Sequence, residues 1–466
     1  RDSVASRGLG DVYKRQQRKK LQRKNQRKNL RKKRHRLTYY DLQFCLMHWK
    51  DTLPDWYIKK YGKQPCVNIG TAGHVDHGKT TLIQALTGSW TSVHSQELKR
   101  GITIRVGYSD AAFYKCKKCE SPLGYSTEPK CPNCGKESEL SRVVSFVDSP
   151  GHESLMANML SGSALIDGAM LLVAANSKVP QPQTKEHLLA LQTLGIKQIV
   201  IVQNKVDLIS YQDALSNFSE ITKFVKGTKH ADSPIIPVSA QSSLNVDALI
   251  GAIEETIETP ERDESKNTVM HVLRSFDINK PGSKIKNLKG GVIGGSLTQG
   301  KFSVGDEIEI KPGLFDDRKK SYQSIQTEIV SLGTGAGLVD SVKPGGLVAI
   351  GTKLDPSLSR SDSLIGSIIG KPDTLPENTT NAKLNINLFD MAVGSVTETK
   401  VAPIRTDELL RVSVGTAPVP AKVKKVKSND IEVEFKRPIC LFDGSNVALS
   451  RRISDRWRLI GAGIVG

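Results

Sequence analysis

The feature that most constrains this fold is a glycine-rich loop between a short apolar run and a helical pattern. Residues 73–80 have the sequence GHVDHGKT, which fits G-x-x-x-x-G-K-[ST]. A mostly apolar predicted strand over 67–69 precedes the loop, and a helical pattern over 80–86 follows it. Glycines let backbone N–H groups turn towards one anion at a helix N-terminus. We therefore predict a phosphate-binding loop in which Lys79 supplies positive charge and Thr80 a hydroxyl ligand for Mg²⁺.

Apolar runs and helical patterns alternate through the first half of the chain. The predicted strands are 67–69, 143–147, 169–175, 199–202 and 235–238, and the predicted helices are 80–86, 153–164, 184–194, 211–226 and 244–257. Nearly all-apolar strands are typical of a parallel sheet that is buried on both faces. The alternation predicts a doubly wound α/β domain over residues 64–262.

The sequence pattern changes after residue 260, where helical periodicity is lost and glycine-containing turns become frequent. Short strands separated by such turns indicate all-β barrels. A polar, proline-containing stretch at 371–381 marks a boundary, so we predict one β-barrel domain over 266–373 and a second over 380–466. The expected architecture is an α/β domain with a phosphate-binding loop, followed by two β-barrels.

Further motifs follow the predicted strands in the order that a guanine-nucleotide site requires. Asp148 and Gly151 lie in DSPG, where the aspartate can hold Mg²⁺ and the glycine N–H can meet a γ-phosphate. Asp207 ends NKVD, and its carboxylate can accept two hydrogen bonds that guanine offers and adenine does not. The segment SAQ at 239–241 can donate a backbone N–H to the guanine O6.

Hydrolysis of a bound guanosine triphosphate needs neutralisation of the phosphate charge and a positioned water. Thr103, in RGITI at 100–104, can reach Mg²⁺ only while a γ-phosphate holds its loop, which would make that loop a switch. We expect Lys79, Thr103 and His152 to be catalytic, with His152 orienting the attacking water or, alternatively, only beginning a helix. The expected nucleotide-binding residues are Gly73, Val75, Asp76, His77, Gly78, Lys79, Thr80, Thr81, Gly151, Asn204, Lys205, Asp207, Ser239, Ala240 and Gln241.

Four of the seven cysteines form two Cys-x-x-Cys pairs within residues 114–136. They are Cys116, Cys119, Cys131 and Cys134. Four thiolates with no open position favour structural, tetrahedral Zn²⁺, and the alternative is a knuckle of free thiols. The expected fold class is therefore an α/β P-loop GTPase domain with a zinc knuckle, followed by two β-barrels. The start of the chain lacks the apolar stretch of a secretory signal, so metal is favoured over disulfides and a cytoplasmic location is expected.

The net charge of +19 is concentrated at the N-terminus, because residues 1–63 contain 20 basic and five acidic residues. Residues 14–36 hold 14 Lys or Arg and no acid, which predicts disorder and general attraction to RNA. Residues 1–16 resemble translated adapter sequence. We therefore expect residues 1–63 to be a disordered or partly artefactual tail. No apolar run is long enough for a transmembrane helix, so no membrane partner is expected.

Longer runs of sequence resemble a known family. VNIGTAGHVDHGKTTL, KRGITI, DSPGH and NKVD together resemble the translational GTPases. KRGITIRVGYSDA ahead of the cysteines, PQPQTKEHLLAL at 180–191 and RSFDINKPG at 274–282 narrow the resemblance to the gamma-subunit family of translation initiation factor 2. LLRVSVGTAPV at 409–419 and the C-terminal RRISDRWRLIGAGIVG also resemble that family, so the resemblance covers residues 64–466.

The resemblance implies GTP-dependent delivery of methionylated initiator tRNA to the small ribosomal subunit, with hydrolysis on start-codon selection. It also implies a heterotrimer with alpha and beta subunits. In the family, Val75 and Ile102 would flank the catalytic water, and Asp76 with the Gly101 backbone would lie near a second cation. The alternatives are a selenocysteine-specific or other tRNA-delivering elongation-type GTPase, and a subunit that binds GTP without hydrolysing it.

Overall fold

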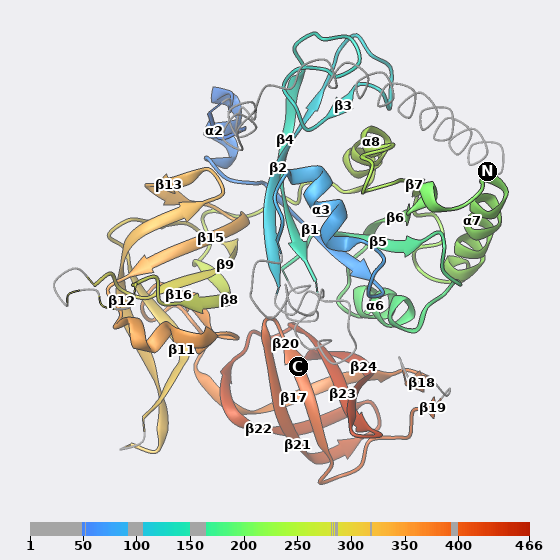
Figure 1. The fold of residues 1–466 in the computed structure, drawn as a ribbon. Helices are drawn as coiled ribbons and strands as arrows, with labels where there is room; N and C mark the ends of the chain where they lie inside the picture. The colour runs from blue at the N-terminus through green and yellow to red at the C-terminus, as the bar shows by residue number, and fades with distance from the viewer. Residues whose placement is uncertain are drawn as a thin grey trace.

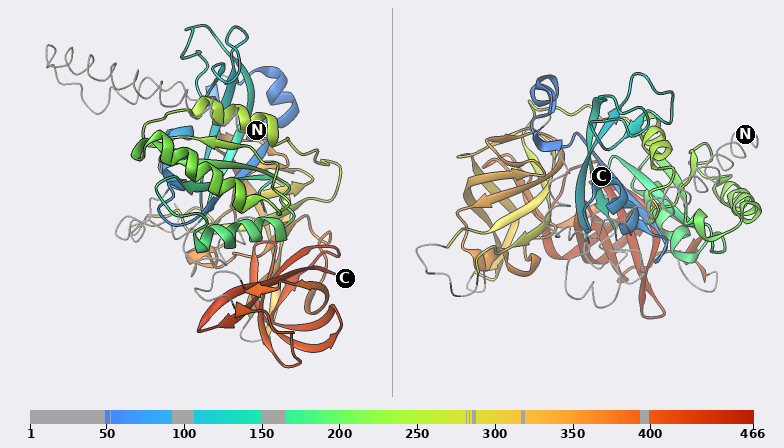
Figure 2. Two further views of the ribbon diagram at one scale, coloured as in Figure 1. Left: turned by 90° about the vertical axis from the view of Figure 1, so that its right-hand side faces the viewer. Right: turned by 45° about the horizontal axis from the view of Figure 1, so that its top comes forward.

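The structure is a computed structural model, and it describes residues 49–51, 53–91, 106–149, 165–280, 282, 284, 288–316, 319–392 and 399–466. These residues form three bodies, an α/β domain and two β-barrels (Figure 1). Figure 2 shows both barrels against the α/β domain, with the C-terminal barrel at its base. Among the described residues no helix is long and apolar enough to cross a membrane.

The α/β domain is built on a seven-stranded sheet of order β3-β2-β4-β1-β5-β6-β7. The strands are β1 (Val67–Gly73), β2 (Gly107–Lys115), β3 (Tyr125–Ser126), β4 (Glu139–Asp148), β5 (Gly168–Ala174), β6 (Gln198–Asn204) and β7 (Ile235–Pro237). The helices are α3 (Lys79–Thr87), α6 (Pro182–Thr193), α7 (Tyr211–Val225) and α8 (Val246–Thr256), with a 3₁₀ turn, η3 (Val206–Leu208).

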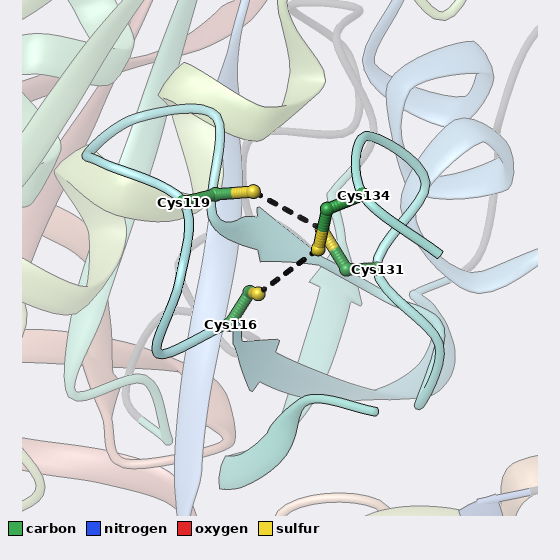
Figure 3. A group of neighbouring side chains, drawn as sticks. All are labelled: Cys116, Cys119, Cys131 and Cys134. Atoms are coloured by element: carbon green, nitrogen blue, oxygen red, sulfur yellow. Dashed lines mark hydrogen bonds between the residues drawn. The ribbon is translucent and has the colours of Figure 1, made fainter. Parts of the chain in front are cut away.

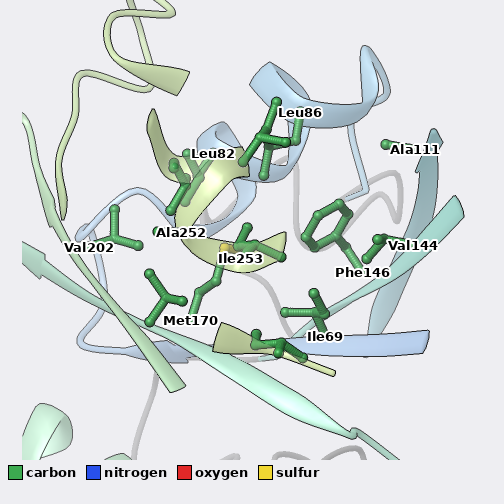
Figure 4. Close-up of a cluster of buried hydrophobic side chains, with 14 of the residues drawn as sticks. Ile69, Leu82, Leu86, Ala111, Val144, Phe146, Met170, Val202, Ala252 and Ile253 are labelled. Carbon is green, nitrogen blue, oxygen red and sulfur yellow. The ribbon is translucent and has the colours of Figure 1, made fainter. Parts of the chain in front are cut away.

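Strands β4, β1, β5, β6 and β7 are parallel, as the apolar runs predicted. Alternate side chains of these strands enter two cores: Met170 packs with α3 and α8, whereas Leu171 packs with α6 and α7. Figure 4 shows the first core, where Phe146 and Ile69 lie beneath Leu86. We did not predict β2 and β3, which pair antiparallel beyond β4. The helix expected at 153–164 lies outside the described residues.

The middle domain is a closed barrel. Its strands β8 (Val269–Phe276), β9 (Val292–Gln299), β11 (Glu307–Asp316), β12 (Ser321–Thr334), β15 (Gly345–Thr352) and β16 (Ile368–Gly370) form the ring β11-β16-β8-β9-β15-β12, which the β11–β12 pairing closes. Outside the ring lie β10 (Phe302–Ser303), β13 (Gly337–Val339), β14 (Ser341–Val342) and a 3₁₀ segment, η5 (Pro356–Asp362). The barrel interior is apolar and includes Met270, Ile310 and Ile350.

The C-terminal domain is a second closed barrel of order β17-β22-β21-β20-β23-β24. Its strands are β17 (Asn378–Leu388), β20 (Leu409–Val414), β21 (Ala417–Lys427), β22 (Asp430–Cys440), β23 (Asn446–Ile453) and β24 (Arg456–Val465), with a small pair β18 (Met391–Ala392) and β19 (Thr399–Lys400) outside. Strand β24 packs beside α6, where Ala190 contacts Ala448 and Leu459. This contact places the C-terminal barrel next to the α/β domain.

Part of the expected tail belongs to the folded protein. After a 3₁₀ turn, η1 (Trp49–Asp51), helix α2 (Asp55–Tyr61) packs against the sheet. The Tyr57 ring is buried with Tyr114 and Val143, and its hydroxyl donates to the Gln64 carbonyl at 3.0 Å. The tail boundary that we predicted at residue 63 is therefore wrong. The aromatic side chains at 56, 57 and 61 supply apolar surface that the basic segment before them lacks.

Candidate nucleotide site and cysteine cluster

Strand β1 ends at Gly73 and helix α3 begins at Lys79, so the motif forms a strand–loop–helix unit. Two of its glycines have positive φ, +135° at Gly73 and +89° at Gly78. A Cβ at Gly73 would lie 2.4 Å from the Leu172 carbonyl oxygen, and one at Gly78 would lie 2.4 Å from Asn204 Nδ2. Only glycine therefore fits either position without displacing a neighbour.

Lys79 lies inside the curve of this loop. Its Nζ donates to the carbonyls of Gly73 at 3.0 Å and His74 at 2.9 Å. Burial lowers the pKa of Lys79 to about 8, although the nearby Asp148 opposes that shift. The loop thus holds a largely charged amine against backbone carbonyls. An ammonium in this position is suited to an incoming phosphate.

Asp148, at the end of β4, is fully buried and accepts hydrogen bonds from three threonine hydroxyls. Thr80 and Thr91 both donate to its Oδ2 at 2.7 Å, and Thr71 donates to its Oδ1 at 3.2 Å. Burial raises the pKa of this carboxyl, and the hydroxyls oppose the shift. A buried carboxylate beside the Thr80 hydroxyl is a donor set that suits a hard cation such as Mg²⁺.

Asn204 links the other predicted motifs to the loop. Its Nδ2 donates to the His77 carbonyl at 2.9 Å, and its Oδ1 accepts from the Ala240 backbone N–H at 3.0 Å. Lys205 follows with φ +63°, and Asp207 lies in η3 with its side chain partly exposed. The segments around residues 77, 204 and 240 are thereby brought together by one side chain.

The remaining predicted site residues differ in their exposure, and four of them lie outside the described residues. Val75 and Thr81 are partly exposed, Asp76 is exposed with φ +60°, and Ser239 is buried beside exposed Gln241. Gly101, Thr103, Gly151 and His152 lie outside the described residues. The structure therefore brings the phosphate loop, Asp148, Asn204 and Ala240 together, and the segments 92–105 and 150–164 lie outside the described residues.

Sequence reasoning missed three residues that hold this site. Thr71 and Thr91 donate to Asp148, and His187 of α6 accepts the Gly73 backbone N–H on its Nδ1 at 2.7 Å. His187 lies in PQPQTKEHLLAL, which we used only as a family marker. No local pattern gives its partner, which is 114 positions away.

The four predicted cysteines converge in the connection between β2 and β4 (Figure 3). This connection lies at the end of the α/β domain away from the C-terminal barrel (Figure 1). Cys116 and Cys134 have sulfurs 3.5 Å apart, and those of Cys119 and Cys131 are 3.8 Å apart. A tetrahedron with Zn–S bonds of about 2.3 Å has sulfur–sulfur edges of about 3.8 Å. A hydrogen bond from the Lys118 backbone lowers the pKa of Cys116 to about 6, whereas a hydrogen bond with the Cys134 thiol raises the pKa of Cys119 to about 12, so the sulfur geometry rather than the pKa values supports a metal site. The cluster therefore fits zinc.

Two family models match the chain. Residues 64–259 match the elongation factor Tu GTP binding domain, and residues 380–465 match the C-terminal domain of initiation factor eIF2 gamma. Together with the loop geometry, these matches define the class: the protein is a translational GTPase, an enzyme class that uses GTP, GDP and Mg²⁺.

Curated relatives narrow this class to one family. The chain is 54% identical to translation initiation factor 2 subunit gamma of Archaeoglobus fulgidus, over 86% of this chain and 94% of the relative. The Methanothermobacter thermautotrophicus protein of that name is also 54% identical, over 86% and 98%, and the Methanocaldococcus jannaschii protein is 51% identical, over 87% and 99%. The chain belongs to the gamma-subunit family of translation initiation factor 2.

Solved structures agree on the fold. A bacterial selenocysteine-specific elongation factor superposes with a TM-score of 0.66 at 22% identity, over 85% of this chain and 58% of that one. Elongation factor SelB of Methanococcus maripaludis, solved with the GTP analogue GPPNHP, gives 0.62 at 23% identity, over 86% and 78%. At such low identity these matches carry the fold alone. The alternative of a selenocysteine-specific factor is not favoured, because the relatives with high identity are initiation factors.

Proposed function

We propose that this chain binds GTP in the loop 73–80, with Mg²⁺ held by Thr80 and Asp148. The observation that carries the proposal is the buried Asp148 carboxylate beside Thr80, next to an amine already directed at the loop carbonyls. Mg²⁺, when bound there, would neutralise phosphate charge. Lys79 would add a second positive charge on the β- and γ-phosphates.

Guanine selection would depend on Asp207, whose carboxylate accepts from the guanine N1–H and exocyclic amine. Asn204 supports this contact indirectly, because it fixes the loops at His77 and Ala240 that would flank the nucleotide. Thr103 and the Gly151 N–H would respond to the γ-phosphate, and His152 would orient the attacking water. A second cation near Asp76 and Gly101 is part of the same proposal.

The four cysteines would hold one structural Zn²⁺. All four sulfurs lie within 4.8 Å of one another and come from two turns, so a single ion can reach every one. With no open ligand position, such an ion would fix the chain between β2 and β4 rather than take part in hydrolysis.

In translation, the chain would carry methionylated initiator tRNA to the small ribosomal subunit together with alpha and beta subunits, and hydrolyse GTP on start-codon selection. Its domains would be residues 64–262 together with the preceding helix α2, residues 266–373 and residues 380–466, and the protein would act in the cytoplasm. The support is the 50–54% identity to initiation-factor gamma subunits over most of the chain.

Filter binding tests this function directly. Labelled methionylated initiator tRNA and an aminoacylated elongator tRNA would be titrated with the protein in GTP or GDP, with and without added alpha and beta subunits. We expect initiator tRNA to bind more tightly with GTP than with GDP and more tightly than elongator tRNA. Equal retention of both tRNAs, or the same affinity in GTP and GDP, would refute the proposal.

A further inference from the structure

His187, on helix α6, contacts the start of the phosphate loop at the end of the central strand β1. The backbone N–H of Gly73 donates to its Nδ1 at 2.7 Å, and the His187 side chain is 1% exposed. Because Nδ1 accepts, its proton must be on Nε2, so the contact fixes one neutral tautomer of the ring. A buried imidazole in one tautomer is a directional acceptor.

The surroundings of His187 keep it neutral. Burial lowers the pKa of His187 to about 3, and the charges of Lys79, His74 and His77 act in the same direction. Protonation at Nδ1 would turn the acceptor into a donor and leave two N–H groups facing each other. The Gly73 contact therefore holds throughout the neutral pH range.

Gly73 is held at both of its peptide groups. Its N–H donates to His187, and its C=O accepts from Lys79 Nζ at 3.0 Å. Its own backbone is in a conformation that only glycine adopts easily, with φ at +135°. Without the His187 acceptor, a buried N–H at the first turn of the loop would lack its partner.

The helix that carries His187 is itself fixed from the far side. The neighbouring Glu186 accepts at Oε1 from Arg458 Nη1 of the C-terminal barrel at 3.0 Å, and both side chains are buried. Ala190 of the same helix packs on Leu459. The imidazole is therefore presented to Gly73 by a helix that two domains hold in place.

We propose that His187 is a positioning residue for the phosphate loop. It acts through the loop, because its hydrogen bond sets the direction of the Gly73 peptide, from which the loop and Lys79 take their places. The proposal rests on the proposed nucleotide site in the loop 73–80. It predicts that nucleotide affinity depends on an acceptor atom at the Nδ1 position and not on the imidazole ring as such.

Two substitutions separate the acceptor from the ring. In His187→Asn the Oδ1 stands the same number of bonds from Cα as the lost Nδ1, whereas in His187→Gln the amide oxygen stands one bond further out. We expect His187→Gln to weaken GDP binding about ten-fold and His187→Asn by no more than about three-fold, measured by release of a fluorescent GDP analogue. His230→Gln, which alters another buried histidine of the same domain, should leave the GDP affinity unchanged.

Two outcomes of the GDP-binding assay would overturn the proposal. Equal losses in His187→Asn and His187→Gln would make the ring a packing element only, and no loss in either would make it irrelevant. If either variant fails to fold, ¹⁵N NMR of the histidines in the wild-type protein decides the matter. His187 Nδ1 should stay unprotonated from pH 8 to pH 5, and titration near 6.5 would overturn the assignment. Wild-type protein that bound no GDP would refute the nucleotide site, while the tautomer measurement would still test His187.

Discussion

Replacing Asn204 with alanine should lower both the stability of the α/β domain and its affinity for nucleotide. Asn204 is 2% exposed, and its two amide atoms bond the His77 carbonyl and the Ala240 N–H, which belong to buried residues. Alanine leaves both backbone groups without these partners. A buried group left unpaired costs about 1–3 kcal/mol, so the two together should cost about 2–6 kcal/mol. Native domains have only about 5–15 kcal/mol of stability.

The assay combines urea unfolding, followed by circular dichroism, with GDP affinity from calorimetry. Asn217→Ala is the matched control, because Asn217 is also buried in this domain and bonds Gln203 at 2.9 Å and the Ser177 carbonyl at 3.3 Å. Both variants should lose stability. Only Asn204→Ala should also lose GDP affinity, by about ten- to a hundred-fold, which is about 1.4–2.8 kcal/mol. Equal GDP affinity in the two variants would show that Asn204 does not organise the site.

Three further predictions concern the base, the loop charge and the metal. Asp207→Asn should move base preference from guanine towards xanthine, and a competition assay in which GTP stays preferred would contradict the base contact. Burial lowers the pKa of Lys79 to about 8 from 10.5, so between those values the folded state releases its proton first. The free energy of unfolding of nucleotide-free protein should therefore rise from pH 8 to 10.5. Over the same range the GTP affinity should fall about ten-fold per pH unit, because the Lys79 charge is lost. A stability or an affinity that does not change with pH would contradict the lowered pKa of Lys79. Wild-type protein should contain one zinc per chain by elemental analysis and Cys131→Ser much less, whereas Cys440→Ser should keep the full content.

A fifth prediction concerns the contact between α6 and the C-terminal barrel. Burial raises the pKa of Glu186 to about 7 even beside Arg458, so Arg458→Met should cost up to about 3–5 kcal/mol at pH 8, where the carboxyl is charged, and less at pH 6, where it is protonated. Adding Glu186→Gln should recover most of that loss, because the buried charge is then gone. Thermal unfolding of the two variants would measure both effects, and an Arg458→Met protein as stable as wild type would contradict them.

The sequence alone determined the features that are encoded in contiguous residues. Glycines at 73 and 78 have no side chain to block a loop that must approach Leu172 and Asn204, so the local motif already required the observed backbone. The parallel strands followed from apolar runs, because a sheet buried on both faces leaves no polar alternation. The two Cys-x-x-Cys pairs likewise predicted their own convergence, which Figure 3 shows.

Only the tertiary structure decided which distant residues meet. Gly73 and His187 are 114 positions apart, and Glu186 and Arg458 are 272 apart. No periodicity in one segment carries information about a partner so far along the chain. Strand β2 and helix α2 were missed for a related reason, because each is stabilised by packing against β4 and its neighbours rather than by its own pattern. Local chemistry fixed the loop that would hold a phosphate, and long-range packing fixed the side chains that hold the loop.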